Sequence, residues 1–292
     1  MWAIKIVAKL ILSRLRLPYR MWAKLGVFRH GHMETAQYVV SVFTNHIKNA
    51  FPNGLPLGAT VLELGGGDSL ASALVAKAYG AGRIYLVDVG EFARMDVEFY
   101  KEIARRFAEL GLDVPDISNA ATLREILRTC NAEYLTGGLE SLRNIPSQSV
   151  DFVWSQAVLE HVRKAKFEAT MVELSRILKL EGKASHVVDF KDHLANALNH
   201  LRFSETLWES DLFASSGFYT NRIQARTMLD MFRRCGFENI RVLREWRWNR
   251  LPTPSRSIDP SFRRVPEVDL LTSCITVTMS RRHGDFVEDL VA

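Results

Sequence analysis

A glycine loop between two acidic residues is the part of this chain best suited to chemistry. Glu63 lies within an apolar run that ends at Leu64, and three glycines, Gly65–Gly67, follow directly. Twenty-five residues after Glu63, a second apolar run ends in Asp88. In open α/β sheets, glycines after the first strand let the backbone approach a ligand, and an acid after the second binds ribose hydroxyls. The spacing therefore predicts a nucleotide site.

The charges around this loop favour one kind of nucleotide. A dinucleotide site carries the pattern G-x-G-x-x-G and places a pyrophosphate on the helix N-terminus. Here Gly65 and Gly67 fit the first two positions, but Leu70 stands at the third. Glu63 before the loop and Asp68 within it would repel a pyrophosphate, and they would attract the cationic amino group and sulfonium of S-adenosylmethionine. A tight strand-to-helix turn without a ligand is the simpler alternative.

Three side chains further along the chain are candidates for acid–base catalysis. A hydroxyl that accepts a methyl group must lose its proton, and a histidine or a carboxylate would remove it. His161 follows a predicted strand over 150–154, and Asp192 and His193 follow another over 184–188. We expect His193 and Asp192 to form a His–Asp base, with His161 as a second candidate. The alternative for His161 is a helix-start residue bonded to the backbone.

The same segment could hold a divalent metal ion. Asp189, Asp192 and His193 carry oxygen and nitrogen atoms of the kind that ligate metals. The alternative is a solvated loop in which Asp192 caps a helix over 194–202. We expect no bound metal. The alternative hypothesis is a metal site with Asp189, Asp192 and His193 as its ligands.

Residues 192–222 are rich in aromatic side chains and predict a helical insert. An aromatic platform, an amide and a cation together suit a carbohydrate or a phosphate-bearing acceptor. The residues that provide them are Trp208, Tyr219, Asn221 and Arg222. A packed helical cover that does not touch substrate is the alternative.

Strands and helices alternate through most of the chain. The predicted strands cover 60–64, 84–87, 132–135, 150–154, 184–188, 239–246 and 273–279. The predicted helices of this region cover 70–79, 97–110, 123–129, 167–180 and 226–235. Such alternation predicts a Rossmann-like α/β fold with a doubly wound, mostly parallel seven-stranded sheet and an antiparallel last strand. N-terminal helices precede this sheet, and the helical insert follows its fifth strand.

The chain divides into three predicted parts: an N-terminal helical extension over 1–57, the main domain over 58–282, and a C-terminal tail over 283–292. The first 20 residues alternate apolar and basic side chains, and Lys9 interrupts an apolar run too short to span a bilayer. This pattern is compatible with an amphipathic helix on an anionic membrane surface. A helix that packs on the core, or on a partner chain in a homodimer, is the alternative.

Composition narrows the classes of protein. Hydrophobic residues make up 47% of the chain and charged residues 24%, which is ordinary for a globular protein. The cysteines Cys130, Cys235 and Cys274 are too few and too far apart for a disulfide framework or a metal pattern. We therefore expect a reducing, cytoplasmic location, including the inner face of a membrane. The net charge of +5 comes without a basic run interleaved with aromatics, so we expect no nucleic-acid partner.

With these segments placed, the chain resembles the class I S-adenosylmethionine-dependent methyltransferases from about residue 59 to 180, and less distinctly to 281. Residues 63–67 are similar to the first family motif, although Ser69 replaces its last glycine. Residues 151–162 are very similar to the fourth-strand motif of small-molecule methyltransferases. Residues 178–183 stand where the family commonly has Leu-Lys-Pro-Gly-Gly, with two changes. The Asn-Pro-Pro-Tyr type of motif of nucleic-acid base methyltransferases does not follow the fourth strand.

The resemblance implies a cofactor site at the carboxyl ends of the first four strands. Its residues are Glu63, Gly65, Gly67, Asp88, Val89, Leu139, Ser155 and Gln156. Glu63 would hold the methionine amino group, and Asp88 would bind both ribose hydroxyls. Val89 would pack on the adenine ring, which the backbone amide of Leu139 would contact. Ser155 and Gln156 would face cofactor and substrate, and the insert over 192–222 would form the acceptor pocket or lid.

The leading hypothesis is a methyltransferase that acts on a hydroxyl of a small molecule or glycan and leaves S-adenosylhomocysteine. The basic start, the loop at 189–193 and the segment at 219–222 resemble bacterial methyltransferases of surface polysaccharide assembly, and a lipid-linked acceptor would fit membrane contact. One alternative methylates a lipid or quinone-like acceptor through an apolar tunnel in the insert. Another is a non-catalytic partner subunit, either cofactor-binding or degenerate, that uses its N-terminal helices to bind another protein.

Overall fold

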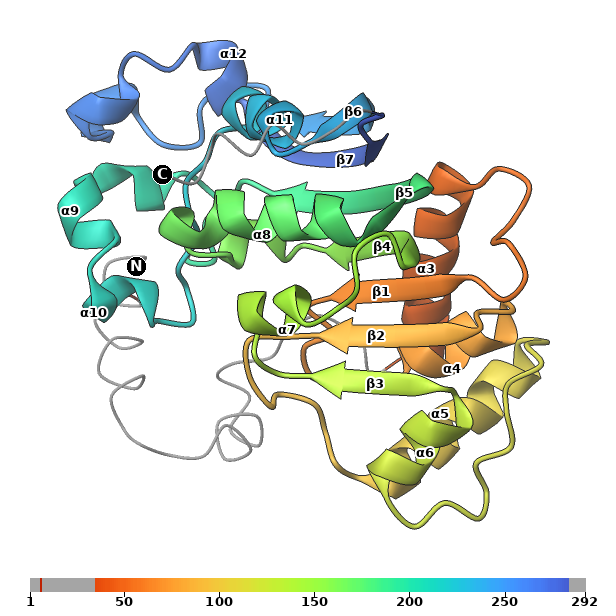
Figure 1. Ribbon diagram of the computed structural model, residues 1–292. Helices are drawn as coiled ribbons and strands as arrows, with labels where there is room; N and C mark the ends of the chain where they lie inside the picture. Colours follow the sequence, from red (N-terminus) through yellow and green to blue (C-terminus); the bar gives the residue numbers. More distant parts are fainter. Residues whose placement is uncertain (1–5, 7–34, 284–292) are drawn as a thin grey trace.

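The computed structural model describes Ile6 and residues 35–283. They form one seven-stranded sheet in the order β3-β2-β1-β4-β5-β7-β6 (Figure 1). The strands are β1 (Thr60–Leu64), β2 (Arg83–Val87), β3 (Ala132–Leu135), β4 (Val150–Gln156), β5 (Leu178–Asp189), β6 (Phe237–Arg247) and β7 (Thr272–Arg281). β1 to β5 run parallel, and β7 is antiparallel to both β5 and β6.

Helices cover both faces of the sheet (Figure 1). One face packs against α3 (Ala36–Ala50), α4 (Ser72–Ala78), α5 (Val97–Glu109) and α6 (Leu123–Thr129). The other packs against α7 (Leu139–Arg143), α8 (Lys164–Ile177) and α11 (Ala225–Arg234). Neighbouring strand residues such as Val61 and Leu62 enter opposite layers, which is why the strands read as unbroken apolar runs. The predicted doubly wound fold with an antiparallel last strand is confirmed.

The predicted boundary between the fifth strand and the helix before it is wrong. We expected a helix over 167–180, but α8 ends at Ile177 and β5 begins at Leu178. Leu178 pairs with Val150, and the register then shifts so that Lys183 pairs with Phe152. Pairing with β4 therefore overrides the helix-forming side chains of the run, because tertiary context outweighs propensity.

The predicted helix over 194–202 is also absent from the described chain, which has only the short 3-10 helix η2 (Asn199–Arg202) there. Asp192 organises a compact turn instead of capping a helix. Its Oδ1 accepts hydrogen bonds from the amides of Leu194 (2.9 Å) and Ala195 (2.6 Å). Its Oδ2 accepts from the amide (2.7 Å) and Nδ2 (3.0 Å) of Asn199. Aspartate side chains commonly compete with helix formation in this way.

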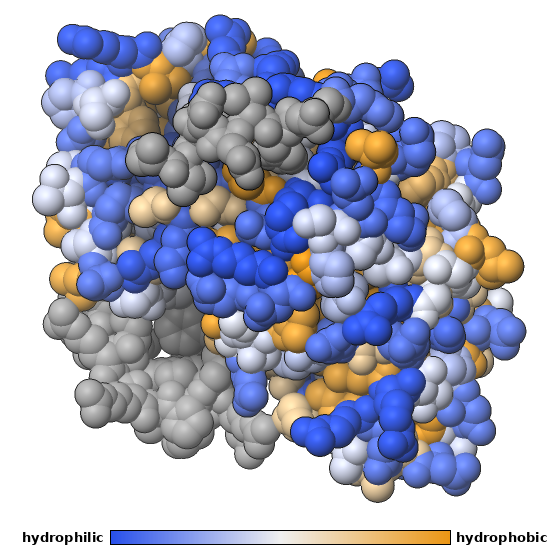
Figure 2. Space-filling view, in the orientation of Figure 1, coloured by the Kyte–Doolittle hydropathy of each residue, from blue (hydrophilic) through white to orange (hydrophobic). Residues whose placement is uncertain are grey.

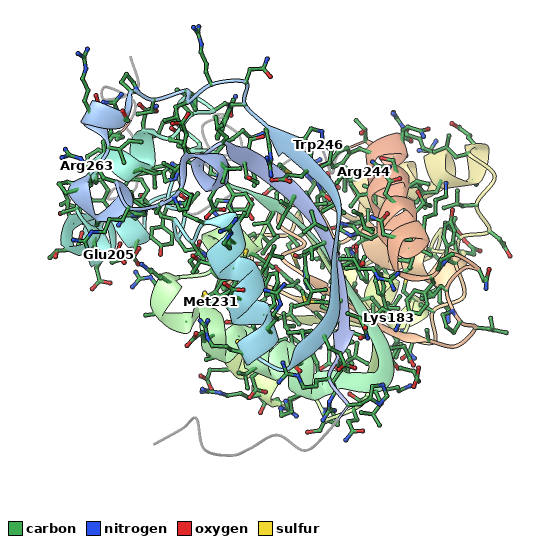
Figure 3. The ribbon with its side chains drawn as sticks, turned by 90° about the horizontal axis from the view of Figure 1, so that it is seen from above. Lys183, Glu205, Met231, Arg244, Trp246 and Arg263 are labelled. Carbon is green, nitrogen blue, oxygen red and sulfur yellow. The ribbon has the colours of Figure 1, made fainter. Side chains whose placement is uncertain are left out.

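The insert continues through α9 (Glu205–Trp208) and α10 (Asp211–Ala214) and lies at the carboxyl ends of the parallel strands (Figure 1). The β6–β7 connection contains η3 (Ser255–Ser257), η4 (Pro260–Phe262) and α12 (Glu267–Leu270). Leu198 and Leu201 of the insert share an apolar cluster with Ile258 and Phe262 of the connection. In the view from above, Glu205 and Arg263 accordingly lie on the same side of the molecule (Figure 3).

β6 forms one outer edge of the sheet and carries partly exposed Leu243 and Trp246 beside Arg244 (Figure 3). Charged side chains on an edge strand oppose pairing with another chain. The face seen in Figure 2 is mostly hydrophilic, and its apolar residues form separate small groups.

Within the predicted N-terminal helical extension, α3 packs on the sheet, where Phe43 meets Trp154 edge-on at 5.2 Å between ring centroids. The predicted amphipathic segment over 1–20 lies outside the described residues, apart from Ile6. Ile6 is buried in the aromatic cluster of the insert. Within the described residues, no helix combines the length and apolar character needed to cross a membrane. The division at residue 57 stays a prediction.

Candidate cofactor and acceptor site

The glycine loop after β1 has a backbone that suits glycine at two positions. Gly65 has φ +77° and Gly67 has φ +60°, a region that other residues adopt at a cost. At Gly65 a Cβ atom would also lie only 2.5 Å from Cγ2 of Val158. The loop after β1 and the segment after β4 are therefore in direct contact.

Asp88 joins this loop to the loops after β2 and β3. Its Oδ2 accepts a hydrogen bond from the amide of Gly67 (3.1 Å), and its Oδ1 accepts one from the amide of Val89 (2.7 Å). Its carbonyl accepts a hydrogen bond from the amide of Gly138 (2.8 Å). Val89 is 78% exposed beside Gly138, and Leu139 follows as the first residue of α7. The residues expected to contact ribose and adenine are thus neighbours around Asp88.

Glu63 is buried at the end of β1, where its Oε2 accepts a hydrogen bond from the hydroxyl of Ser72. Burial raises the pKa of Glu63 to about 7, and the nearby charge of Asp88 adds to the rise. Hydrogen bonds from Ser72 and Trp154 act in the opposite direction. A cation next to Glu63 and Asp88 would relieve this repulsion, whereas an anion would increase it. The pair therefore fits the cationic end of S-adenosylmethionine.

Ser155 and Gln156 belong to a buried histidine network that the sequence did not reveal. The Oγ of Ser155 lies 2.7 Å from Nδ1 of His186, and Oε1 of Gln156 accepts a hydrogen bond from Nε2 of His46 (3.1 Å). Burial lowers the pKa of His46 to about 4 and that of His186 to about 3, so both are neutral. Ser155 is fully buried and its hydroxyl faces His186, so its predicted place beside the ligands stays a prediction.

His161 and His193 meet after the carboxyl ends of β4 and β5. Their Nε2 atoms are 3.1 Å apart, and their rings stack with centroids 4.8 Å apart. The Nδ1 of His161 donates to the carbonyl of Tyr219 (2.9 Å). The prediction that His193 and Asp192 form a His–Asp general base is corrected. The carboxylate of Asp192 is buried in the turn described above, and His193 contacts His161 instead.

The three ligands of the alternative metal hypothesis, Asp189, Asp192 and His193, do not form a group of potential ligands among the described residues. The Oδ1 of Asp189 accepts a hydrogen bond from the amide of Lys191, and its Oδ2 is 3.3 Å from Nζ of Lys191. Glu160, which the sequence analysis did not single out, lies with His161 and His193 so that one ligand atom of each falls within 4.8 Å of the others. Glu160 is buried, and this burial, followed by the charge of Asp189, raises its pKa well above the usual range.

The four predicted acceptor-binding side chains all lie inside the insert. Trp208 is fully buried and its Nε1 donates to the carbonyl of Thr220 (2.7 Å). The hydroxyl of Tyr219 donates to Oε2 of Glu209 (2.8 Å). Arg222 is 4% exposed, and its Nη2 donates to Glu205 (2.6 Å). These side chains hold the insert together instead of facing an open surface.

Asn221 fastens the insert to the segment after β4. Its Nδ2 donates to the carbonyls of Leu159 (2.8 Å) and Val162 (3.0 Å), and its own amide donates to the carbonyl of Glu160 (2.7 Å). Asn221 is therefore a positioning residue for the loop that carries Glu160 and His161.

Two cavities occur near these elements. A small one of about 10 Å³, enough for about one water molecule, is lined by residues that include Glu160, His200, Thr220 and Arg222. Each of these four has a buried polar atom that has no hydrogen-bond partner among the described residues. A larger one of about 410 Å³ lies among α11, β6 and α12, away from the glycine loop.

The family described as "Methyltransferase domain" matches residues 62–185. This part of the chain resembles a methyltransferase domain. The matched residues include the glycine loop, Asp88, and the segment with Glu160 and His161, and the match supports S-adenosylmethionine as the cofactor. It does not distinguish between types of acceptor. No curated protein matches the sequence.

Solved structures match most of this chain at low sequence identity, with TM-scores below 0.5. The YcgJ protein from Bacillus subtilis is 18% identical, with 85% of this chain and 100% of that chain covered and a TM-score of 0.46. A SAM-dependent methyltransferase from Archaeoglobus fulgidus is 12% identical, with coverages of 85% and 95% and a TM-score of 0.45. Phosphoethanolamine N-methyltransferase 2 from Haemonchus contortus, in complex with S-adenosyl-L-methionine, is 13% identical, with coverages of 82% and 52% and a TM-score of 0.45.

Proposed function

We propose that this chain is an S-adenosylmethionine-dependent methyltransferase that methylates a hydroxyl of a small-molecule or glycan acceptor. The observation that carries this function is the convergence of Glu63, Asp88 and the Gly65–Gly67 loop at the carboxyl ends of β1 and β2. Asp88 already orders the loop through the amide of Gly67. The buried charge pair of Glu63 and Asp88 fits a ligand with a cationic end.

The cofactor supplies an electrophilic methyl carbon, so the residues of the chain mainly bind, orient and deprotonate. Asp88 binds the ribose hydroxyls, and Glu63 attracts the methionine amino group. Val89 and Leu139 flank the adenine. We assign removal of the acceptor proton to the group formed by Glu160, His161 and His193. Both histidines are exposed, and they lie next to the segment after β4 that contacts Gly65.

The structure of the insert favours a polar acceptor over a lipid or quinone-like one. An apolar tunnel was the feature expected for the second class of acceptor. The rings of Trp208, Phe213 and Phe218 fill the insert instead, with centroids 5.5–5.9 Å apart. The proposal also includes a lipid-linked glycan as acceptor, a homodimer, a cytoplasmic location and contact with the inner face of a membrane.

Calorimetric titration with S-adenosylmethionine and S-adenosylhomocysteine tests the proposed function. Wild-type protein is expected to bind both. Asp88→Ala should weaken binding roughly 10- to 100-fold, because it removes hydrogen bonds to a charged group worth about 1.5–3 kcal/mol. Asp113→Ala, at an exposed position, is the matched control and should leave affinity unchanged. If folded wild-type protein binds neither ligand, the non-catalytic partner hypothesis takes precedence.

A further inference from the structure

Glu160, His161 and His193 form a compact group of potential metal ligands. One atom from each lies within 4.8 Å of the others. Glu160 and His161 belong to the 3-10 helix η1 (Leu159–His161) after β4, and His193 follows β5. Because β4 and β5 are parallel neighbours, their carboxyl ends bring together residues that are 32 positions apart.

The tautomer of neutral His161 is fixed for metal binding. Its Nδ1 faces the carbonyl oxygen of Tyr219 at 2.9 Å, and a carbonyl only accepts hydrogen bonds. The proton of the neutral ring therefore sits on Nδ1, and the lone pair sits on Nε2. That Nε2 is the atom that faces Nε2 of His193 at 3.1 Å. A histidine that donates its second ring nitrogen to a backbone carbonyl is the usual arrangement around protein-bound metals.

Glu160 adds an unusual feature. It is 2% exposed, and its Oε1 accepts a hydrogen bond from the amide of Asp189 (3.3 Å). Its Oε2 is buried and receives no hydrogen bond from any residue of the described chain. A buried carboxyl oxygen without a partner is costly, which calls for a ligand at this position.

We propose that Glu160, His161 and His193 form a binding site for a divalent transition-metal ion of the zinc type. Two imidazoles and one carboxylate are a common ligand set of open zinc sites, which keep one coordination position for water or substrate. Imidazole ligands favour zinc-like ions, whereas magnesium prefers oxygen ligands alone. Both histidines are exposed, so the open position faces solvent.

If the chain is the proposed methyltransferase, the ion takes part in the reaction. Only this role of the ion, and not the metal site itself, rests on the proposed function. An acceptor hydroxyl bound at the open position loses its proton to solvent more readily, because the ion lowers its pKa. The resulting oxygen anion donates an electron pair to the methyl carbon as the carbon–sulfur bond breaks. The electrons of that bond stay on sulfur, which becomes the neutral thioether of S-adenosylhomocysteine.

Metal titration of tag-free, full-length protein tests the site. Calorimetry with Zn²⁺ should show one tight equivalent, and Co²⁺ should give the intense visible absorption of a four-coordinate ion. His193→Ala removes an exposed ligand without disturbing the core, and affinity should fall at least roughly 10- to 100-fold, the range for losing even an outer partner. Glu160→Gln should weaken Zn²⁺ binding and alter the Co²⁺ spectrum.

Histidines elsewhere provide the controls. His283→Ala changes another exposed histidine and should leave the titration unchanged. A His30→Ala, His32→Ala double variant controls for the His-Gly-His segment outside the described residues. If Zn²⁺ does not bind, or binds equally well to wild type, His193→Ala and Glu160→Gln, the proposal is overturned. Unchanged affinity in Glu160→Gln alone would remove Glu160 from the site and so overturn the proposed three-ligand arrangement.

The titration also separates this proposal from the proposed function. Binding of S-adenosylmethionine without Zn²⁺ binding would leave the methyltransferase proposal standing and refute the metal site. Binding of Zn²⁺ at these residues without cofactor binding would give the reverse result.

Discussion

The Nε2 of His46 donates a hydrogen bond to Oε1 of Gln156, 110 residues away, and so ties α3 to the end of β4. The same ring accepts a hydrogen bond at Nδ1 from the hydroxyl of Ser185, 2.8 Å away. Because Gln156 uses its carbonyl oxygen for His46, its amide nitrogen is directed elsewhere. The helix before the sheet thus sets the orientation of a predicted site residue.

Burial of neutral His46 predicts a loss of stability in acid. Its pKa is about 4 in the folded chain and 6.5 in the reference state, so the unfolded chain binds a proton first as pH falls. The free energy of unfolding should therefore be at its full value above pH 6.5 and fall towards pH 4, by on the order of 3 kcal/mol. Urea denaturation at several pH values measures this slope.

His46→Gln is the variant for that test, and its curve should be flatter than that of wild type between pH 4 and 6.5. Because His186 is buried with a pKa of about 3, it supplies a second contribution that His46→Gln leaves in place. Equal slopes for wild type and His46→Gln would contradict the assignment of a neutral buried imidazole.

The raised pKa of Glu63 predicts that cofactor binding strengthens with pH. Below pH 7 its carboxyl is mostly neutral, and above pH 7 it is an anion that attracts the cationic end of S-adenosylmethionine. The Kd should fall roughly 10-fold between pH 6 and pH 8, as expected for one group with this pKa. Glu63→Gln should remove the dependence, whereas Glu109→Gln, at an exposed position, should keep it. Identical pH profiles for all three proteins would contradict this role of Glu63.

Gly65→Ala tests the contact between the loops after β1 and β4. The substitution adds strain at φ +77° and places Cβ 2.5 Å from Cγ2 of Val158, so the free energy of unfolding should drop by about 2–4 kcal/mol. Gly54→Ala has a similar φ of +93° but nothing within 4 Å, and should cost only about 1 kcal/mol. Adding Val158→Ala to Gly65→Ala should recover the steric part. A double variant no more stable than Gly65→Ala would show that the two residues do not clash.

Asn221→Ala tests how the insert positions the loop with Glu160 and His161. It leaves the carbonyls of Leu159 and Val162 without their donor, so a loss of about 2–3 kcal/mol is expected. Hydrogen exchange should speed up across 158–163, while Asn144→Ala, at an exposed position, should change neither quantity by much. Unaltered exchange in 158–163 would mean that other contacts hold this loop.

The sheet was predictable because its strands carry strong local signals. The segments over 60–64 and 132–135 have the predicted bounds, because glycine follows the first and Asn131 precedes the second, and such residues commonly mark the ends of a strand. The start of β5 was not predictable. Its first residues are ordinary helix formers, and only pairing with Val150 makes them a strand.

Glu63 and Asp88 were predictable as site residues, because their proposed role depends on an acidic residue at the end of a strand. The site was not predictable where a polar side chain bonds to distant backbone. Asn221 and Arg222 look like ligand-binding residues in sequence, but their partners include carbonyl groups that every residue has. Glu160 was missed because nothing in the sequence shows that it is buried beside His193.

The internally bonded insert also defines where new acceptor preferences could be engineered. Trp208, Tyr219, Asn221 and Arg222 belong to its framework, so libraries that randomise them would mostly return unfolded protein. The side chains of Thr206 and Leu207 are exposed on α9, and Ser215 is exposed after α10. Directed evolution that varies these outward positions can reshape the surface of the insert while its scaffold stays intact.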